Sequence, residues 1–283
     1  MSASPEILAP AGCIRRLQTA VAFGADAVYG AATRLGLRKH ADNFNEPELA
    51  AGIAFAQARG TKVYLTLNIL PLERDWPICA PTIRRLARLR PDAVIVADPG
   101  IARLVREETG LRLHVSTQAS VCNRATAELW RERGASRVVC ARELGIEAAA
   151  ALGRAAGVEV ECFVHGAMCA SYSGKCVISN YLAGRDANRG GCVQTCRHQF
   201  SDPAGGWTAP IMNARDLLSL GLMPRLAAAG IDACKIEGRM KSALYVAVTV
   251  AAYRAARDGD RQRLAPLRRL LTQLANRGHS SGA

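Results

Sequence analysis

The chain has 283 residues, of which 49 % are apolar and only 5 % aromatic, and its formal net charge is +13. This length suits one α/β barrel of about 250 residues, whose core Ala, Leu, Val and Ile would have to fill. No apolar run reaches the ~20 residues that span a bilayer, and the first residues show neither the basic nor the apolar part of a secretory signal. We therefore expect a cytoplasmic protein without membrane insertion, in which clustered cysteines bind metals or react rather than form disulfides.

Arginine supplies much of the positive charge, in one stretch at 84–90 and another at 254–277. A basic surface attracts polyanions, of which RNA is the most obvious. An arginine-rich surface that is merely solvated would have the same composition. Charge alone therefore leaves both interpretations open.

Short β-branched runs alternate along the chain with amphipathic helical patterns. The expected strands are 7–9, 27–29, 62–68, 93–97, 113–116, 137–140, 158–164 and 233–237. The expected helices between them are 14–23, 46–58, 83–89, 99–108, 124–133 and 146–156. Eight strands with intervening helices are typical of parallel βα units, and no GxGxxG follows the first strand. The pattern predicts a single (β/α)8 TIM-type barrel over residues 1–283.

About seventy residues separate the seventh expected strand from the eighth. Connections of that length are usually functional, and we expect residues 166–232 to form a metal-binding insertion. Residues 261–283 form a basic C-terminal tail, whose small polar end we expect to fray. The other elements expected in these parts of the chain are a hairpin at 201–210 and helices at 214–221, 223–230, 242–258 and 261–274.

The insertion contains Cys169, Cys176, Cys192 and Cys196, with six, fifteen and three residues between successive members. Two close pairs joined by a glycine-rich polar loop are typical of a metal site, and tetrahedral thiolate ligation indicates zinc or an iron–sulfur cluster. The spacing is not that of a zinc ribbon, which favours the cluster. Zinc, or four unconnected buried thiols, remain the alternatives. The other six cysteines lie in predicted helices and strands and are interpreted as structural.

Functional groups of a TIM-type barrel gather where the strands end, and this chain places several polar residues there. We expect catalytic roles for His165, Glu161 and Glu237, and substrate binding by Asn68, Gln118, Arg239 and Lys241. The fork of Arg239 suits a carboxylate or a phosphate. A lone histidine can also be a packed residue, and the two amides can simply bond loop backbone.

Glu161 has a structural interpretation as strong as its catalytic one. It lies inside a predicted strand, where an ionised carboxylate is costly without a partner. An ion pair across the barrel with Lys235 or Arg239 would satisfy it.

The stretch EVECFVHGAMCASYSGKCVIS, at 159–179, resembles the signature of the collagenase-like peptidase family, unclassified peptidase family thirty-two. Further similar segments are EILAPAG at 6–12, GADAVY at 24–29, NF at 43–44, STQAS at 116–120 and KIEGRMKS at 235–242. The resemblance covers nearly the whole chain. The segment YLAGRDANRGGCVQTCR, at 181–197, is most similar to the branch of tRNA uridine 5-hydroxylases.

That resemblance implies an iron–sulfur protein for oxygen-independent hydroxylation, most directly of a tRNA uridine. It makes Cys169, Cys176, Cys192 and Cys196 the ligands of a 4Fe–4S cluster, RNA the partner, and prephenate a co-substrate candidate. Longer relatives in this branch continue past an NRG-like motif, which stands here at 276–278.

Three alternatives stay open beside RNA hydroxylation. One is a subunit for oxygen-independent hydroxylation of the ubiquinone ring, and another is a non-enzymatic subunit that binds a homologous partner. The third is the proteolysis in the family's name. The sequence contains no HExxH, so the zinc motif of common metallopeptidases is missing.

Overall fold

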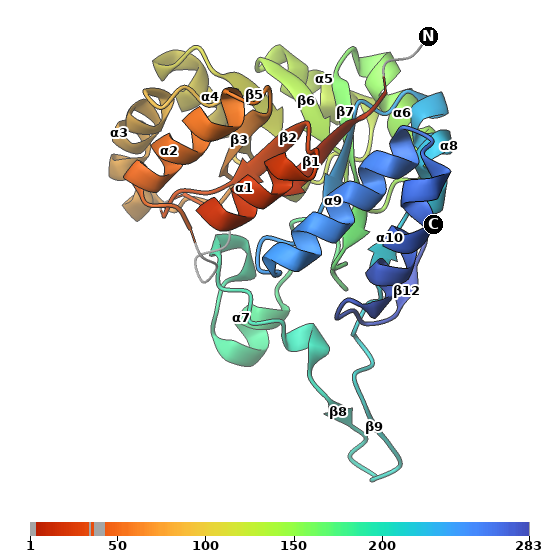
Figure 1. Cartoon of the computed structure of the whole chain (residues 1–283). Helices are drawn as coiled ribbons and strands as arrows, with labels where there is room; N and C mark the ends of the chain where they lie inside the picture. Colours follow the sequence, from red (N-terminus) through yellow and green to blue (C-terminus); the bar gives the residue numbers. More distant parts are fainter. Residues whose placement is uncertain (1–3, 34, 37–42, 283) are drawn as a thin grey trace.

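The computed structural model describes residues 4–33, 35–36 and 43–282, and eight parallel strands form its centre. The strands are β1 (Glu6–Pro10), β2 (Ala27–Gly30), β3 (Lys62–Leu67), β4 (Ala93–Val96), β5 (Arg112–Val115), β6 (Ala135–Val139), β7 (Glu159–Gly166) and β11 (Ala233–Ile236). Each pairs in parallel with the next, and β11 pairs with both β7 and β1. This last pairing closes the sheet, so the predicted TIM-type barrel is confirmed (Figure 1).

Helices surround the barrel, and all except α10, which comes after α9, follow a strand as the βα pattern predicted (Figure 1). Their bounds are α1 (Ile14–Ala22), α2 (Glu46–Gln57), α3 (Trp76–Ala87), α4 (Pro99–Glu108), α5 (Arg124–Glu132), α6 (Ile146–Ala156), α8 (Met223–Ala229), α9 (Ala243–Arg257) and α10 (Arg261–Gln273). Local chemistry starts several of them: Asn45 and Glu48 form a capping box, and Asp98 accepts from the Ile101 amide. Alanine and branched aliphatic residues fill the layer between helices and barrel.

The interior of the barrel holds a second, smaller apolar cluster that contains Leu8, Tyr29, Tyr64 and Ile95. Because side chains alternate along a strand, these residues point inward while their neighbours face the helices. Few aromatics are needed for the outer layer, and two of the six tyrosines fill the interior instead.

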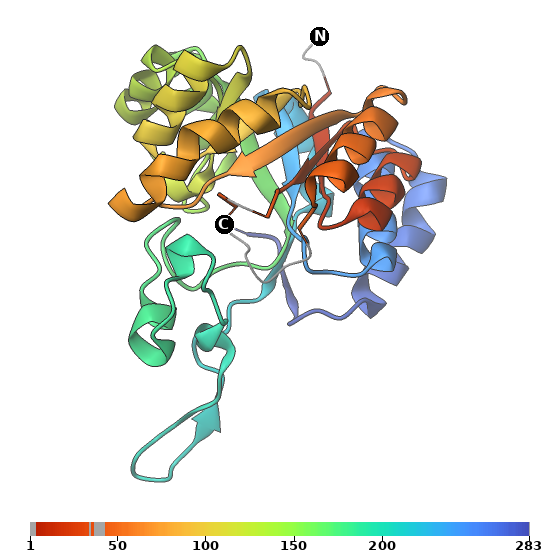
Figure 2. The ribbon, with the colours of Figure 1, turned by 90° about the vertical axis from the view of Figure 1, so that its left-hand side faces the viewer.

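The insertion leaves the barrel after β7 and returns at β11, on the side where the parallel strands end (Figure 2). It contains α7 (Ile178–Ala183) and the antiparallel pair β8 (Phe200–Ser201) and β9 (Thr208–Ala209). The predicted hairpin at 201–210 is therefore confirmed. Figure 2 shows this hairpin as the part of the chain farthest from the barrel.

Two predictions near the end of the insertion and the chain are wrong. Residues 214–221, predicted as a helix, contain the strand β10 (Asp216–Leu218), which pairs antiparallel with the end of β7. The expected frayed tail contains β12 (His279–Ser280), which pairs with β10. Tertiary pairing decides both cases, since β10 gains partners on each side that no local pattern shows. No helix in the described residues is long and apolar enough to cross a membrane.

Candidate functional site at the mouth of the barrel

The ends of β3 and β5 bring three polar side chains together at the mouth. The Asn68 amide nitrogen donates to Ser116 Oγ over 3.2 Å and to Gln118 Oε1 over 3.1 Å. The hydroxyl of Ser116 also donates to Gln118. Both Asn68 and Ser116 are buried, so this network fixes the orientation of Gln118, whose side chain faces the insertion.

The first part of the insertion lies directly on this network. Gly174 has φ +70°, and a Cβ there would stand 2.1 Å from the carbonyl oxygen of Gln118. Only glycine permits both this conformation and this approach. The neighbouring Ser173 is buried, accepts from the Arg142 amide over 3.1 Å, and donates from its own amide to Glu143 Oε1 over 3.0 Å. These contacts fix the loop against the ends of β5 and β6.

The four clustered cysteines line a single cavity of about 120 Å³ between this loop and the mouth. Thr117, Gln118 and Arg142 contribute to its wall from the barrel. Cys169 and Cys192 are exposed, whereas Cys176 and Cys196 are partly covered. The structure thus brings together the four cysteines that the spacing singled out, although fifteen residues separate the two pairs.

The thiols influence one another electrostatically. Burial raises the pKa of Cys196, and the nearby Cys169, Cys192 and Cys176 raise it further, while Arg197 opposes them. Nη1 of Arg142 lies 3.4 Å from the sulfur of Cys169 and donates to it. The Arg142 guanidinium thus places a positive charge directly beside one sulfur of the cavity.

The four thiols suit a polynuclear cluster by their chemistry, but they are not gathered tightly around one point. Within the described ranges, no three His, Cys, Asp or Glu side chains converge as the ligands of a metal ion. A single zinc ion needs all its thiolates about 2.3 Å from one atom. In a 4Fe–4S cluster each cysteine binds a different iron, so sulfurs distributed over a cavity wall fit that group.

A second cavity, of about 260 Å³, adjoins the first and is called the anion cavity below. Its wall contains Arg197, Lys241 and Glu237, and Gln194 belongs to the walls of both cavities. Gln194 has φ +61°, a conformation that is strained for a side chain with a Cβ and that often marks functional sites. Two cations beside Gln194 make this cavity suitable for a carboxylate or phosphate.

His165 lies near the mouth but is enclosed by protein. Its ring packs against Tyr245 and Tyr253, and the hydroxyl of Tyr253 lies 3.4 Å from its Nδ1. Burial lowers the pKa of His165 to about 3, so the ring is neutral at physiological pH. Its backbone carbonyl accepts from the Glu237 amide over 2.9 Å. His165 is therefore placed to position Glu237 rather than to carry a positive charge.

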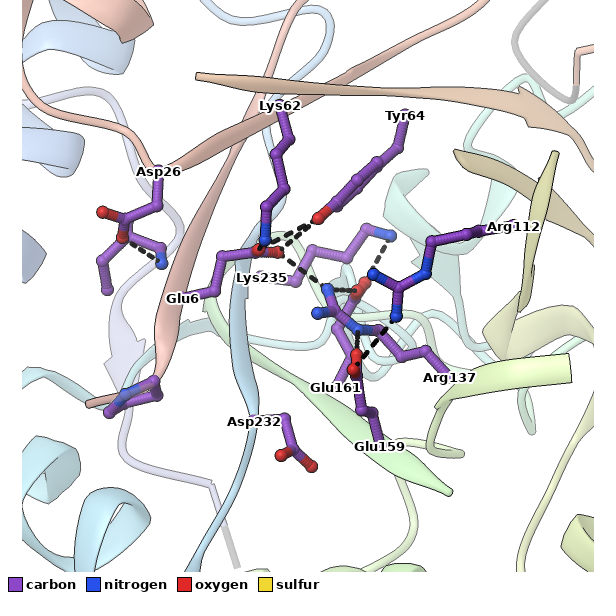
Figure 3. Close-up of polar contacts among 12 residues, drawn as sticks. Glu6, Asp26, Lys62, Tyr64, Arg112, Arg137, Glu159, Glu161, Asp232 and Lys235 are labelled. Atoms are coloured by element: carbon purple, nitrogen blue, oxygen red, sulfur yellow. Dashed lines mark hydrogen bonds and ion pairs between the residues drawn. The ribbon is translucent and has the colours of Figure 1, made fainter. Parts of the chain in front are cut away.

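Glu161 belongs to a different region, an ion-pair network at the N-terminal end of the barrel interior (Figure 3). Its side chain is fully buried, and Lys235 Nζ lies 2.8 Å from Oε1 and Arg137 Nη1 3.5 Å from Oε2. The same Arg137 pairs with Glu6 over 2.7 Å. The pairing of Glu161 with Lys235 agrees with its structural interpretation.

The remaining predicted binding residues divide between the two cavities. Gln118 lines the cysteine-lined cavity, and Lys241 lines the anion cavity and donates to the Ala275 carbonyl over 3.1 Å. Arg239 is buried, and its Nη2 donates to Asn43 Oδ1 over 2.7 Å. Glu237 and Lys241 are thus at one site, while the side chain of Arg239 turns toward the segment after β2.

Three residues of the mouth were not predicted from sequence: Arg142, Ser173 and Gln194. In the sequence, Arg142 is only a polar residue just after the sixth expected strand. In the structure it contacts a clustered cysteine, and its guanidinium lies 4.2 Å from the Phe163 ring centre. In the sequence, Ser173 is only one of several serines within the 159–179 signature. Gln194 carried no signal beyond standing between Cys192 and Cys196, because its position in two cavity walls depends on the folded loop.

The fold and the mouth together define a class: a closed (β/α)8 barrel whose seventh βα connection is a cysteine-rich insertion over the strand ends. The model of peptidase family U32 matches residues 12–282. The chain belongs to this family.

Two relatives and one solved structure are informative. The tRNA hydroxylation protein P1 of Bacillus subtilis (strain 168) is 41 % identical over 266 residues, which cover 90 % of this chain and 63 % of the relative. The tRNA hydroxylation protein P of Escherichia coli (strain K12) is 33 % identical over 335 residues, covering 98 % and 74 %. This chain thus spans about two thirds to three quarters of their lengths.

The structure of the U32 peptidase Mk0906 aligns with a TM-score of 0.57 at 19 % identity, over 84 % of this chain and 95 % of the other. At that identity the likeness supports the fold alone.

Proposed function

We propose that this chain is an iron–sulfur protein for oxygen-independent hydroxylation of RNA, most directly the 5-hydroxylation of a tRNA uridine. The observation that carries the proposal is the placement of four thiols around one cavity at the barrel mouth. Relatives that share the chain almost from end to end are named for tRNA hydroxylation. The net charge of +13 agrees with a polyanionic substrate.

In this proposal Cys169, Cys176, Cys192 and Cys196 hold a 4Fe–4S cluster. When bound, such a cluster transfers single electrons at a potential that hydrogen bonds to its sulfurs adjust. The guanidinium of Arg142 supplies one such hydrogen bond, to the sulfur of Cys169. Ser173 and Gly174 keep the loop with the first two cysteines against the barrel.

Hydroxylation without molecular oxygen needs another source of the hydroxyl group. The anion cavity is the place for an anionic co-substrate, for which prephenate is the candidate. Arg197 and Lys241 would neutralise its carboxylates, and Gln194 would separate it from the cysteines. Glu237, in the same wall, is the carboxylate placed to accept or donate a proton, and Tyr29 donates to its Oε2 over 3.1 Å.

The two buried histidines do not favour proteolysis. A serine or cysteine nucleophile needs an adjacent base, but His165 faces Tyr253, and both ring nitrogens of His114 lack hydrogen-bond partners. Each statement refers to the part of the chain that the structure describes. We therefore rank hydroxylation above the activity in the family's name.

The first experiment tests the cluster. We expect protein purified without oxygen to be brown and to contain about four iron and four sulfide per chain. Changing any of Cys169, Cys176, Cys192 or Cys196 to Ser should remove most of the iron. Cys122→Ser is the matched control, since Cys122 is exposed but lies outside the cavity. A colourless protein with one zinc per chain would contradict the cluster.

The second experiment tests the reaction. Nucleosides of tRNA from a strain lacking this chain should have lost their 5-hydroxyuridine derivatives, and the wild-type chain and Cys122→Ser should restore them. Unchanged tRNA nucleosides would overturn the proposal. Loss of ubiquinone under anaerobic growth would instead favour the quinone alternative. Co-purification of a stoichiometric homologous subunit, with no activity of this chain alone, would favour the non-enzymatic subunit.

A further inference from the structure

The surface beside the cysteine-lined cavity contains apolar side chains that protein does not cover. Between residues 172 and 182 four large apolar side chains are exposed: Tyr172 by 72 %, Val177 by 65 %, Tyr181 by 89 % and Leu182 by 53 %. Single exposed apolar residues are ordinary, but a group of them marks a contact surface. With Lys175 and Arg185, these residues are called the tyrosine face.

The tyrosine face begins at the cavity itself. Tyr172 lines the cavity together with the clustered cysteines, and Tyr181 lies on α7, which follows Cys176 (Figure 2). The backbone that carries them is fixed: the Lys175 amide donates to the Tyr172 carbonyl over 3.1 Å, and Asn188 Nδ2 donates to the Cys176 carbonyl over 3.0 Å. Rings presented by an ordered loop cost little entropy when they bind.

The charge of this region is mainly positive. Residues 167–200 contain four Lys and Arg side chains against one carboxylate, that of Asp186, and one of the four, Arg189, pairs with Asp75 over 2.6 Å. Asp186 is engaged in the loop, where its Oδ1 accepts from the Asn188 amide over 2.8 Å. Lys175 and Arg185 are exposed. An aromatic surface interleaved with cations is the arrangement that holds unpaired nucleic acid.

We propose that the tyrosine face binds an unpaired segment of RNA, whose bases stack on Tyr172 and Tyr181 and whose phosphates lie near Lys175 and Arg185. This inference rests on the proposed function and specifies its substrate as single-stranded at the point of contact. Bases in a duplex are already stacked on one another, so only unpaired ones are free to stack on protein rings. A symmetric contact between two copies is disfavoured, because it would bring the same positive surface against itself.

The test is binding of the full chain, purified anaerobically, to a labelled stem–loop RNA with an unpaired uridine-containing loop, compared with a blunt duplex of the same stem. Tyr172→Ala and Tyr181→Ala should each weaken binding to the stem–loop roughly tenfold, the loss expected for one stacked base. Tyr→Phe at either position should restore binding. Lys175→Gln should lower the slope of log affinity against log salt by about one.

Phe23→Ala is the matched control, since Phe23 is an aromatic residue exposed by 42 % at the end of α1, away from the insertion. It should bind both RNAs as the wild type does. Equal binding of duplex and stem–loop, or unchanged binding by both Tyr→Ala variants, would overturn the inference. A change from dimer to monomer in these variants by sedimentation would assign the face to a second copy and would overturn it too.

Failure here is separable from failure of the proposed function. If the deletion strain lacks 5-hydroxyuridine derivatives and the Tyr172→Ala, Tyr181→Ala double variant restores them with unchanged RNA affinity, the tyrosine face is wrong and the proposed function stands. The cluster's absorption in each variant separates a lost contact from a damaged cavity.

Discussion

The two ends of the barrel are held together by different interactions. At the N-terminal end the interior contains paired charged side chains from four strands, β1, β6, β7 and β11, and Arg137, Glu161 and Lys235 are almost fully buried (Figure 3). At the C-terminal mouth, hydrogen bonds made by Asn68, Ser116 and Ser173 join the strand ends to the loops, and some of them involve a charged partner such as Glu143. The comparison separates what stabilises the barrel from what shapes the site, as expected for this fold.

The chemistry of each end follows from this division. Glu6 illustrates the buried end: burial tends to raise its pKa, but Arg137 and Lys62 outweigh burial and lower it, so it stays ionised. A closed set of such pairs leaves no room for a substrate. At the mouth, by contrast, the cysteine-lined cavity and the anion cavity both have cations in their walls. Glu161, a catalytic candidate by sequence, lines neither of them.

The largest effect on the free energy of unfolding is expected when the buried ion-pair network at the N-terminal end is broken. Glu161→Ala would leave Lys235 and Arg137 without their buried partner, and we expect a loss of about 3–5 kcal/mol in the free energy of unfolding. Urea unfolding measures it. Glu159→Ala is the control, because Glu159 pairs with the same Arg137 but is 36 % exposed, and solvent screening limits its effect to about 1 kcal/mol. Equal losses in the two variants would contradict the comparison.

The next effect is a pH dependence to which both ends contribute. Burial lowers the pKa of His165 to about 3, and burial together with the charge of Arg137 lowers that of His114. Below the unfolded histidine pKa of about 6.5, the unfolded chain binds more protons, so stability falls as pH drops toward the folded pKa. Between pH 7 and pH 5 we expect a loss of about 2 kcal/mol from His165, and a further loss in the same direction from His114.

His114→Phe sharpens this test, because the ring of His114 packs edge-on against Tyr64 and its nitrogens have no partners to lose. The variant should show a smaller pH dependence between pH 7 and pH 5 in urea unfolding. The exposed His198, changed to Ala, should leave it intact. A His114→Phe protein with the wild-type pH profile would show that His114 does not titrate as proposed.

A smaller effect is expected when a hydrogen bond at the mouth is removed. Ser173→Ala leaves the Arg142 amide without its acceptor and removes the hydroxyl bond to Glu143 Oε2, while the backbone bond to Glu143 stays, at a cost of about 1–2 kcal/mol. Because Ser173 joins the insertion to the barrel, limited proteolysis should cut the insertion faster while the barrel keeps its unfolding midpoint. Ser171→Ala, in the same loop, is the control. Uniform destabilisation of the barrel would mean that the two ends are not separable.

The smallest effect on stability is expected at the anion cavity. Lys241→Met removes a charge from its wall and a partly exposed bond to Ala275, so unfolding should change by less than about 1 kcal/mol. Affinity for a small dicarboxylate such as prephenate, measured by calorimetry, should fall roughly tenfold, as expected for one lost charged hydrogen bond. Unchanged affinity would place the co-substrate elsewhere.

The sequence by itself determined the architecture. Eight β-branched runs and most helices between them lie within a few residues of their predicted positions, because alternation and periodicity are local and each barrel unit repeats them. The exception is α3, predicted at 83–89, which begins seven residues earlier, at Trp76. The cysteine spacing singled out the four thiols that share a cavity.

Only the tertiary structure decided which polar residues face the cavities. Glu161 and Glu237 are both acidic residues of the strands that meet beside the insertion, yet one is enclosed by Lys235 and Arg137 and the other lines the anion cavity. β10 and β12 likewise formed because they meet each other and β7, not because of their own sequences. The physical reason is the same in each case: burial, pairing and charge depend on residues far away in the chain, which no local pattern contains.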